Sequence, residues 1–214
     1  MKNLFTFGCS FTGGNGCLSH EDYAKKYKLG DDHLIWPEII AKELQLNLFN
    51  AGLGDIGNDK ILDSVIDAYD LIDRGDIVII EKTFTHRFDI PYKPNKPNKP
   101  NKSNLKDRFL TITPWSGDEL LKQGYTSDEI THILYHTYLL DGIVNEARTA
   151  KRFEFLKKVL FNKSVKNCIM WDVMEHHTQF ERIIDITAGE IKDEHWSYKG
   201  HRDFSKLIIN KIDE

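Results

Sequence analysis

The chain has 214 residues, enough to bury a sizeable core in one domain and too few for two domains of ordinary size. Its composition, 40% hydrophobic and 29% charged, is typical of globular proteins, and the net charge of −4 argues against a nucleic-acid or anionic-membrane partner. No segment approaches the roughly 18 apolar residues of a membrane-spanning helix, no signal-peptide pattern is present, and the three cysteines form no disulfide framework. We therefore expect a cytoplasmic protein, with a phage-encoded, virion-associated protein as the alternative.

Four short apolar runs predict β-strands, and the segments between them have the spacing of amphipathic helices. The most strand-like run is DIVIIEKT, whose β-branched residues suit a strand buried on both faces. On one predicted helix we expect Ile61, Val65, Ile66 and Tyr69 to share a face. In chain order the predicted elements are a strand at 3–8, a helix at 33–45, a strand at 46–52, a helix at 57–73, a strand at 76–83, two helices within 117–162, a strand at 167–173 and a helix at 197–212.

Strands that alternate with helices predict an α/β protein with three α/β/α layers and a doubly wound, mainly parallel sheet. We expect a single domain over residues 1–214, with an insertion at approximately 88–165. Within that insertion the sequence repeats Pro-Asn-Lys over residues 93–104. Proline at every third position is incompatible with a helix or a central strand, so this repeat is expected to form a solvated loop.

Polar residues gather where the predicted strands end. In an open parallel sheet, ligands bind outside the carboxyl ends of the strands. Ser10 follows the first strand, Thr83 ends the third, and Asp193 and His195 precede the last helix. A serine, a histidine, a carboxylate and nearby backbone amides are the components of an acyl-transfer site.

Three segments resemble blocks of the GDSL/SGNH hydrolase family. FGCSFT, residues 7–12, resembles the first block, in which Gly-Asp-Ser follows the first strand. NAGLGDIGND, residues 50–59, resembles the glycine-bearing second block, and DEHWSYKGH, residues 193–201, resembles the last block. The resemblance implies a flavodoxin-like fold and a serine esterase that needs no cofactor and no metal.

The resemblance also implies a role for individual residues. Ser10 is expected to be the nucleophile, His195 the base that takes its proton, and Asp193 the acid that orients the imidazole. The backbone amides of Ser10 and Gly54 are expected to bind the oxyanion of the intermediate.

The sequence departs from the family pattern at three places. Cys9 stands where the family has an aspartate that supports the nucleophile loop. The acid and the histidine are separated by one residue instead of the usual two, which keeps Asp172 as an alternative acid. No third-block asparagine follows the third strand, so Asn58 or Thr83 is expected to supply that donor, and we favour Asn58 because it carries an amide.

The resulting prediction is hydrolysis of a carboxylic ester of a small molecule or carbohydrate, with a sugar O-acetyl group as one candidate. The alternative is a catalytically inert relative that acts as a binding or structural component, for example of a virion. A nucleotide site at GGNG, residues 13–16, is disfavoured because the loop lacks the ending of a P-loop. The oligomeric state stays open.

Other polar residues have simpler interpretations. His132 and His136 lie four apart on a predicted helix without a third ligand, so we interpret them as neighbours on a helix face and not as a metal site. Arg87 is expected either to bind a substrate carboxylate or phosphate, or to pair with an acidic side chain.

Overall fold

The computed structural model describes residues 2–14, 34–91, 109–114, 116–122, 124–140, 142–185 and 190–214. For some of these, including residues 183–185 and 190–194, the description is of the backbone alone. The Pro-Asn-Lys repeat predicted to form a loop lies outside the described residues.

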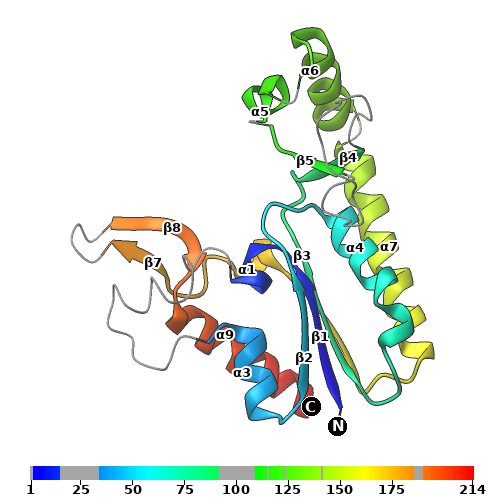
Figure 1. The fold of residues 1–214 in the computed structure, drawn as a ribbon, viewed down its shortest axis with the longest axis vertical. Coiled ribbons are helices and arrows are strands. Elements are labelled where there is room, and N and C mark those ends of the chain that lie inside the picture. The colour runs from blue at the N-terminus through cyan, green and yellow to red at the C-terminus, as the bar shows by residue number, and fades with distance from the viewer. Residues whose placement is uncertain are drawn as a thin grey trace.

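Four parallel strands form the central sheet (Figure 1). Its strand order is β2-β1-β3-β6, and the predicted strands are confirmed almost to the residue. Val78, Ile79 and Ile80 of β3 are completely buried, as expected for a strand covered on both faces. The strands are β1 (Asn3–Gly8), β2 (Asn47–Gly52), β3 (Ile77–Lys82) and β6 (Asn167–Asp172).

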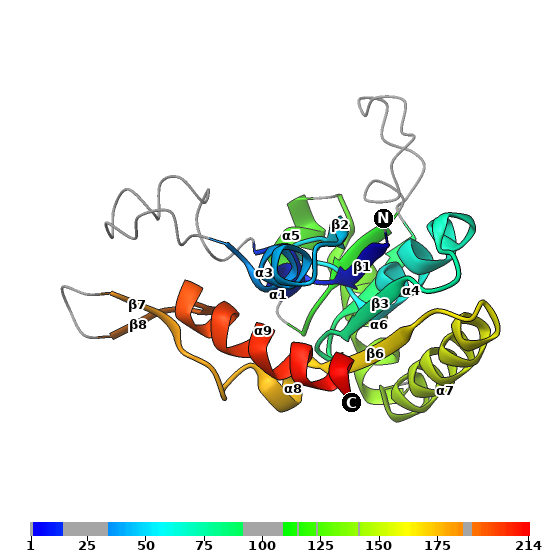
Figure 2. The ribbon, with the colours of Figure 1, turned by 90° about the horizontal axis from the view of Figure 1, so that it is seen from below.

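Helices cover both faces of this sheet, so the fold is the predicted three-layer α/β/α arrangement. In Figure 2, α3 (Trp36–Glu43) and α9 (Tyr198–Asp213) lie on one side of the sheet. The other side is covered by α4 (Asn58–Asp67) and α7 (Gly142–Asn162). Because the four strands are parallel, their carboxyl ends lie at the same edge of the sheet. Ligands bind at this edge in such folds.

The prediction for the apolar face of α4 was partly wrong. Ile61 and Val65 are completely buried, but Ile66 is 60% exposed, and Leu62 is buried instead. An α-helix turns by about 100° per residue, so position 66 lies about 140° around the helix from position 61. The helix then ends at Asp67, and a short 3-10 turn, η1 (Tyr69–Leu71), follows it.

The segment at 117–162 contains more elements than the two predicted helices. Two short helices precede α7, and Gly124, with φ +86°, ends the first of them in a backbone conformation that favours glycine. Thr126 then caps the second by accepting from the Glu129 amide. These elements are α5 (Gly117–Lys122), α6 (Ser127–Leu134) and the π-helical turn η3 (Tyr135–Leu140).

Two antiparallel strand pairs were not predicted. β4 (Phe88–Pro91) pairs with β5 (Phe109–Ile112), and near them α5 and α6 project beyond the carboxyl end of the sheet (Figure 1). β7 (Arg182–Asp185) pairs with β8 (Glu190–Trp196), which corrects the expected loop before the last helix. The sequence of β8 is highly charged and lacks the apolar alternation that signals a half-buried strand, so pairing with β7 and not local pattern defines it.

Two four-residue helices complete the described elements: α1 (Ser10–Gly13) and α8 (Val173–His176). Across the described part of the chain, no helix has both the length and the hydropathy to cross a bilayer.

Candidate active site

Ser10 and His195 form a direct contact, although 185 positions separate them. Ser10 Oγ lies 2.6 Å from His195 Nε2, a hydrogen-bond distance. Ser10 follows the end of β1 and is 5% exposed, while His195 lies near the end of β8 and is half-buried. The imidazole packs against the Phe11 ring, with 4.9 Å between the ring centroids. The serine and histidine that the sequence pattern selected therefore meet.

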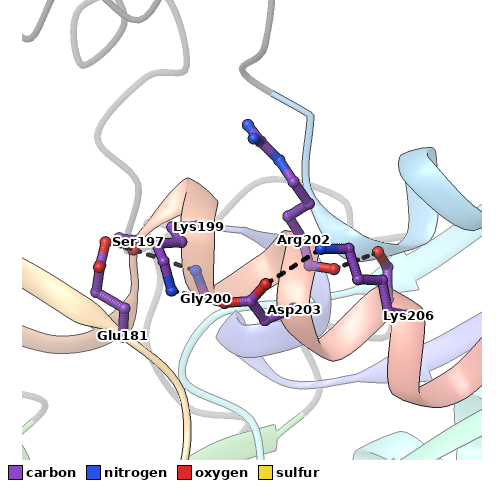
Figure 3. A network of polar contacts seen from close by, with 8 residues as sticks. Glu181, Ser197, Lys199, Gly200, Arg202, Asp203 and Lys206 are labelled. Carbon is purple, nitrogen blue, oxygen red and sulfur yellow. Dashed lines mark hydrogen bonds and ion pairs between the residues drawn. The ribbon is translucent and has the colours of Figure 1, made fainter.

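A network of polar contacts surrounds the junction between β8 and α9, just after His195 in the chain (Figure 3). Ser197 caps α9, because its hydroxyl accepts from the Gly200 amide at 3.2 Å and donates to Glu181 Oε1 at 2.7 Å. Gly200 is required here, since a Cβ at this position would lie 2.3 Å from the Glu181 carbonyl oxygen. Further along the helix, the Lys199 ammonium lies 2.7 Å from Asp203 Oδ2. This network of hydrogen bonds fixes the chain just after His195.

A buried glutamate that the sequence analysis missed supports the loop carrying Ser10. Glu81 of β3 is completely buried and accepts from the Cys9 amide at 3.1 Å, the Cys9 thiol at 2.6 Å and the Thr12 hydroxyl at 2.5 Å. Burial raises the pKa of the Glu81 carboxyl to about 7, against the hydrogen bonds and the nearby Arg87 charge, which lower it. The sequence signal was a carboxylate that directly follows four apolar strand residues and precedes Lys82.

Cys9 precedes Ser10 and binds the Glu81 carboxylate through its amide and its thiol. Its side chain is completely buried, and burial, together with the charge and hydrogen bond of Glu81, raises the pKa of the thiol to about 12. A thiol with this pKa stays protonated at neutral pH and is a poor nucleophile. The thiol donates to Glu81, whereas the Ser10 hydroxyl is the group that contacts His195.

The second strand is tied to the nucleophile loop through Asn50. Its side-chain carbonyl accepts from the Thr6 hydroxyl at 3.0 Å and from the Gly52 amide at 2.9 Å, and its amide donates to the Thr12 carbonyl at 3.1 Å. A Cβ on Gly52 would lie 2.3 Å from the Gly13 nitrogen, so the two loops meet too closely for a side chain. Gly54 lies in the turn that follows, and it shares no hydrogen bond with Ser10 in the described part of the chain.

The two alternative oxyanion donors, Asn58 and Thr83, bind each other. The Thr83 amide donates to Asn58 Oδ1 at 2.9 Å, and Asn58 Nδ2 donates to the Thr83 carbonyl at 3.2 Å. Both residues are buried, 7% and 1% exposed. This pair joins the start of α4 to the residue after β3.

The alternative acid Asp172 is engaged elsewhere. It lies 3.0 Å from the Lys82 ammonium and accepts from the Met174 amide at 2.9 Å, which caps α8. Among the described residues, no hydrogen bond or ion pair joins Asp172 to His195. Asp193 lies in β8, two residues before His195, and its side chain falls outside the description.

The remaining histidine candidates have structural partners. The rings of His132 and His136 are tilted against each other with their centroids 4.1 Å apart, and His201 is buried against Trp196. Among the residues that the structure describes, no group of three His, Cys, Asp or Glu side chains has a metal-binding arrangement.

Neither a protein-family model nor a curated protein matches the sequence. Comparison with solved structures does find likenesses. The chain is similar to proteins assigned to a lipolytic G-D-S-L family. One, from Desulfitobacterium hafniense DCB-2, is 12% identical over 99% of both chains, with a TM-score of 0.34. Another, from Veillonella parvula DSM 2008, is 14% identical over 99% of both chains, with a TM-score of 0.36.

Proposed function

We propose that the protein is a serine hydrolase that cleaves a carboxylic ester, with Ser10 as the nucleophile and His195 as the general base. The observation that carries the proposal is the 2.6 Å contact between Ser10 Oγ and His195 Nε2. This distance suits transfer of the hydroxyl proton to the imidazole, which a serine needs to become nucleophilic.

The proposed reaction has two steps. As Ser10 Oγ adds to the ester carbonyl carbon, His195 takes the hydroxyl proton and a tetrahedral oxyanion forms. The imidazolium then protonates the leaving alkoxide, which departs and leaves an acyl-enzyme. A water molecule, deprotonated by the same histidine, adds to the acyl carbonyl and releases the carboxylic acid and the free serine.

Asp193 is proposed as the acid that orients the imidazole. β8 is extended from Asp193 to His195, and residues two apart in a strand share a face. Asp172 is the weaker candidate because its carboxylate already binds Lys82.

The oxyanion is proposed to be bound by three N–H groups. The Ser10 amide donates no hydrogen bond among the described residues, and the Gly54 amide lies in the neighbouring turn. Asn58 is a better third donor than Thr83, since its NH₂ group carries two hydrogens and only one is used, on the Thr83 carbonyl. The loss of one such donor typically costs about 10²–10³ in rate.

A fluorophosphonate probe, which reacts with activated serines, tests this proposal. The wild type should be labelled and should hydrolyse p-nitrophenyl acetate, whereas Ser10→Ala should do neither. His195→Ala should lower the hydrolysis rate by about 10³-fold or more. Ser64→Ala is the matched control, because the Ser64 hydroxyl donates to the Lys60 carbonyl within α4 and is not activated by a base.

An unlabelled wild type that hydrolyses no short-chain ester, while circular dichroism shows it folded, would reject the esterase. That result would favour the alternative of a catalytically inert binding or structural component. If the enzyme is active, the substrate is proposed to be a small-molecule or carbohydrate ester, such as an O-acetyl sugar.

A further inference from the structure

A cavity of about 150 Å³ lies beside the candidate active site, at the carboxyl edge of the sheet. It is lined by Asn58 and Thr83, the two candidate oxyanion donors, and by residues of α7. Pockets that enclose a whole small-molecule ligand measure roughly 300–1,000 Å³, so this one suits a single substituent of a larger molecule. Its cationic lining residues are Lys82, Arg87, Arg148 and Arg152.

Two of these four cations are neutralised by carboxylates within the same cavity. Lys82 pairs with Asp172 at 3.0 Å, and Arg152 pairs with Asp59. Those pairs leave no net charge on that part of the wall.

Within the part of the chain that the structure describes, the other two cations show no such partner. Arg87 is half-buried, and its Nη1 donates to the Thr83 hydroxyl at 3.5 Å. Its guanidinium also lies 5.0 Å from the centroid of the Phe84 ring, which fixes its direction. Among the described residues, no carboxylate lies within ion-pair distance of Arg87 or Arg148. Glu146 also lines the cavity, but it is exposed and forms no ion pair with Arg87 or Arg148 among the described residues.

A chain of ring contacts connects this cavity to the catalytic pair. The Phe84 ring, over which Arg87 lies, contacts the Phe11 ring with 6.3 Å between centroids. Phe11 in turn packs against the His195 imidazole. Burial raises the pKa of Glu81, and the Arg87 charge acts in the opposite direction by lowering it. The guanidinium therefore lies within electrostatic reach of the loop that carries Ser10.

We propose that this cavity is a subsite for an anionic group, a carboxylate or a phosphate, held by Arg87 with Arg148. The planar guanidinium binds either group through two parallel hydrogen bonds. Anion binding by this cavity is independent of the proposed function. The assignment of the anionic group to the ester substrate rests on that function. The consequence is a substrate preference: esters that carry an acidic substituent a short distance from the scissile bond should bind better than neutral esters.

Calorimetric titration of Ser10→Ala with inorganic phosphate and, separately, with succinate at constant ionic strength tests the subsite without turnover. Whichever anion binds tighter identifies the group, and adding Arg87→Gln should weaken that binding at least tenfold. Arg148→Gln is a second variant, placed on an exposed helix position where misfolding is not expected. Arg74→Gln is the matched control, because Arg74 is exposed and precedes β3 at the opposite edge of the sheet.

The proposal is overturned if neither anion binds, or if Arg87→Gln and Arg74→Gln change the affinity equally. Binding that depends on Arg87 in a protein that hydrolyses no ester would retain the subsite and reject the esterase. Ester hydrolysis by a protein that binds neither anion would retain the esterase and reject the subsite.

Discussion

The buried carboxyl of Glu81 should make the stability of the protein depend on pH, and Glu81→Gln should remove that dependence. Its pKa is raised from 4.5 to about 7 in the folded protein. The folded state therefore keeps a proton that the unfolded chain releases between these values, so stability falls as the pH rises from 4.5 to 7. Below that window both states are protonated, and above it both are ionised. At about 1.4 kcal/mol per pKa unit, the total loss is about 3 kcal/mol, of which about 2–3 kcal/mol falls between pH 5 and pH 8.

Urea unfolding, followed by tryptophan fluorescence at several pH values between 5 and 8, measures this effect. The free energy of unfolding of Glu81→Gln, relative to wild type, should rise by about 2–3 kcal/mol over that range. Glu175→Gln removes one negative charge from an exposed position and serves as the control. A difference between Glu81→Gln and wild type that is constant from pH 5 to 8 would refute the reasoning.

Two further predictions concern the elements around the site. Gly200→Ala should lower the free energy of unfolding in urea by about 1–3 kcal/mol and reduce ester hydrolysis, because the new Cβ would lie 2.3 Å from the Glu181 carbonyl oxygen. Gly117→Ala is the control and should be near neutral, since a Cβ there has no atom within 4 Å. Equal effects of the two variants would contradict the prediction. Cys9→Asp should be destabilising because it brings a second carboxylate beside Glu81 in a buried site, and adding Glu81→Gln should recover about 0.5–3 kcal/mol of the free energy of unfolding. Strictly additive effects in that double-mutant cycle would show that residues 9 and 81 do not interact.

The sheet was predictable from the sequence because its strands are defined by local pattern. The run from Ile77 to Ile80 is apolar at every position, which is the signal of a strand buried on both faces. The alternation of strands and helices predicted a parallel sheet, but the order β2-β1-β3-β6 comes from the structure. The smaller elements were not predictable in the same way, since β8 has a charged sequence and is extended only because β7 pairs with it. The buried faces of the helices were predictable only in part. Ile66 is apolar and was expected in the core, but the rotation of the helix exposes it to solvent.

The candidate site was predictable where its residues follow strand ends. Ser10 and His195 were selected because one ends the first strand and the other precedes the last helix, and these ends converge in a doubly wound sheet. The pairing of Asn58 with Thr83 was not predictable, because these mutual hydrogen bonds join positions 25 apart in the chain. Arg87 was interpreted in two ways, and only the positions of neighbouring carboxylates distinguish them.

The loop that carries Ser10 is supported by a side chain that lies far from it in the sequence. The family resemblance implies an aspartate at position 9, yet here the carboxylate comes from Glu81, 72 positions away, and the loop donates to it through Cys9. In the register of β1 and β3, Phe7 pairs with Ile80, so position 81 lies opposite Gly8. A Cβ on Gly8 would lie 2.3 Å from Glu81 Oε2, and the carboxylate reaches the loop because that Cβ is missing. Glycine at 8 and glutamate at 81 therefore act together to support the loop that carries Ser10.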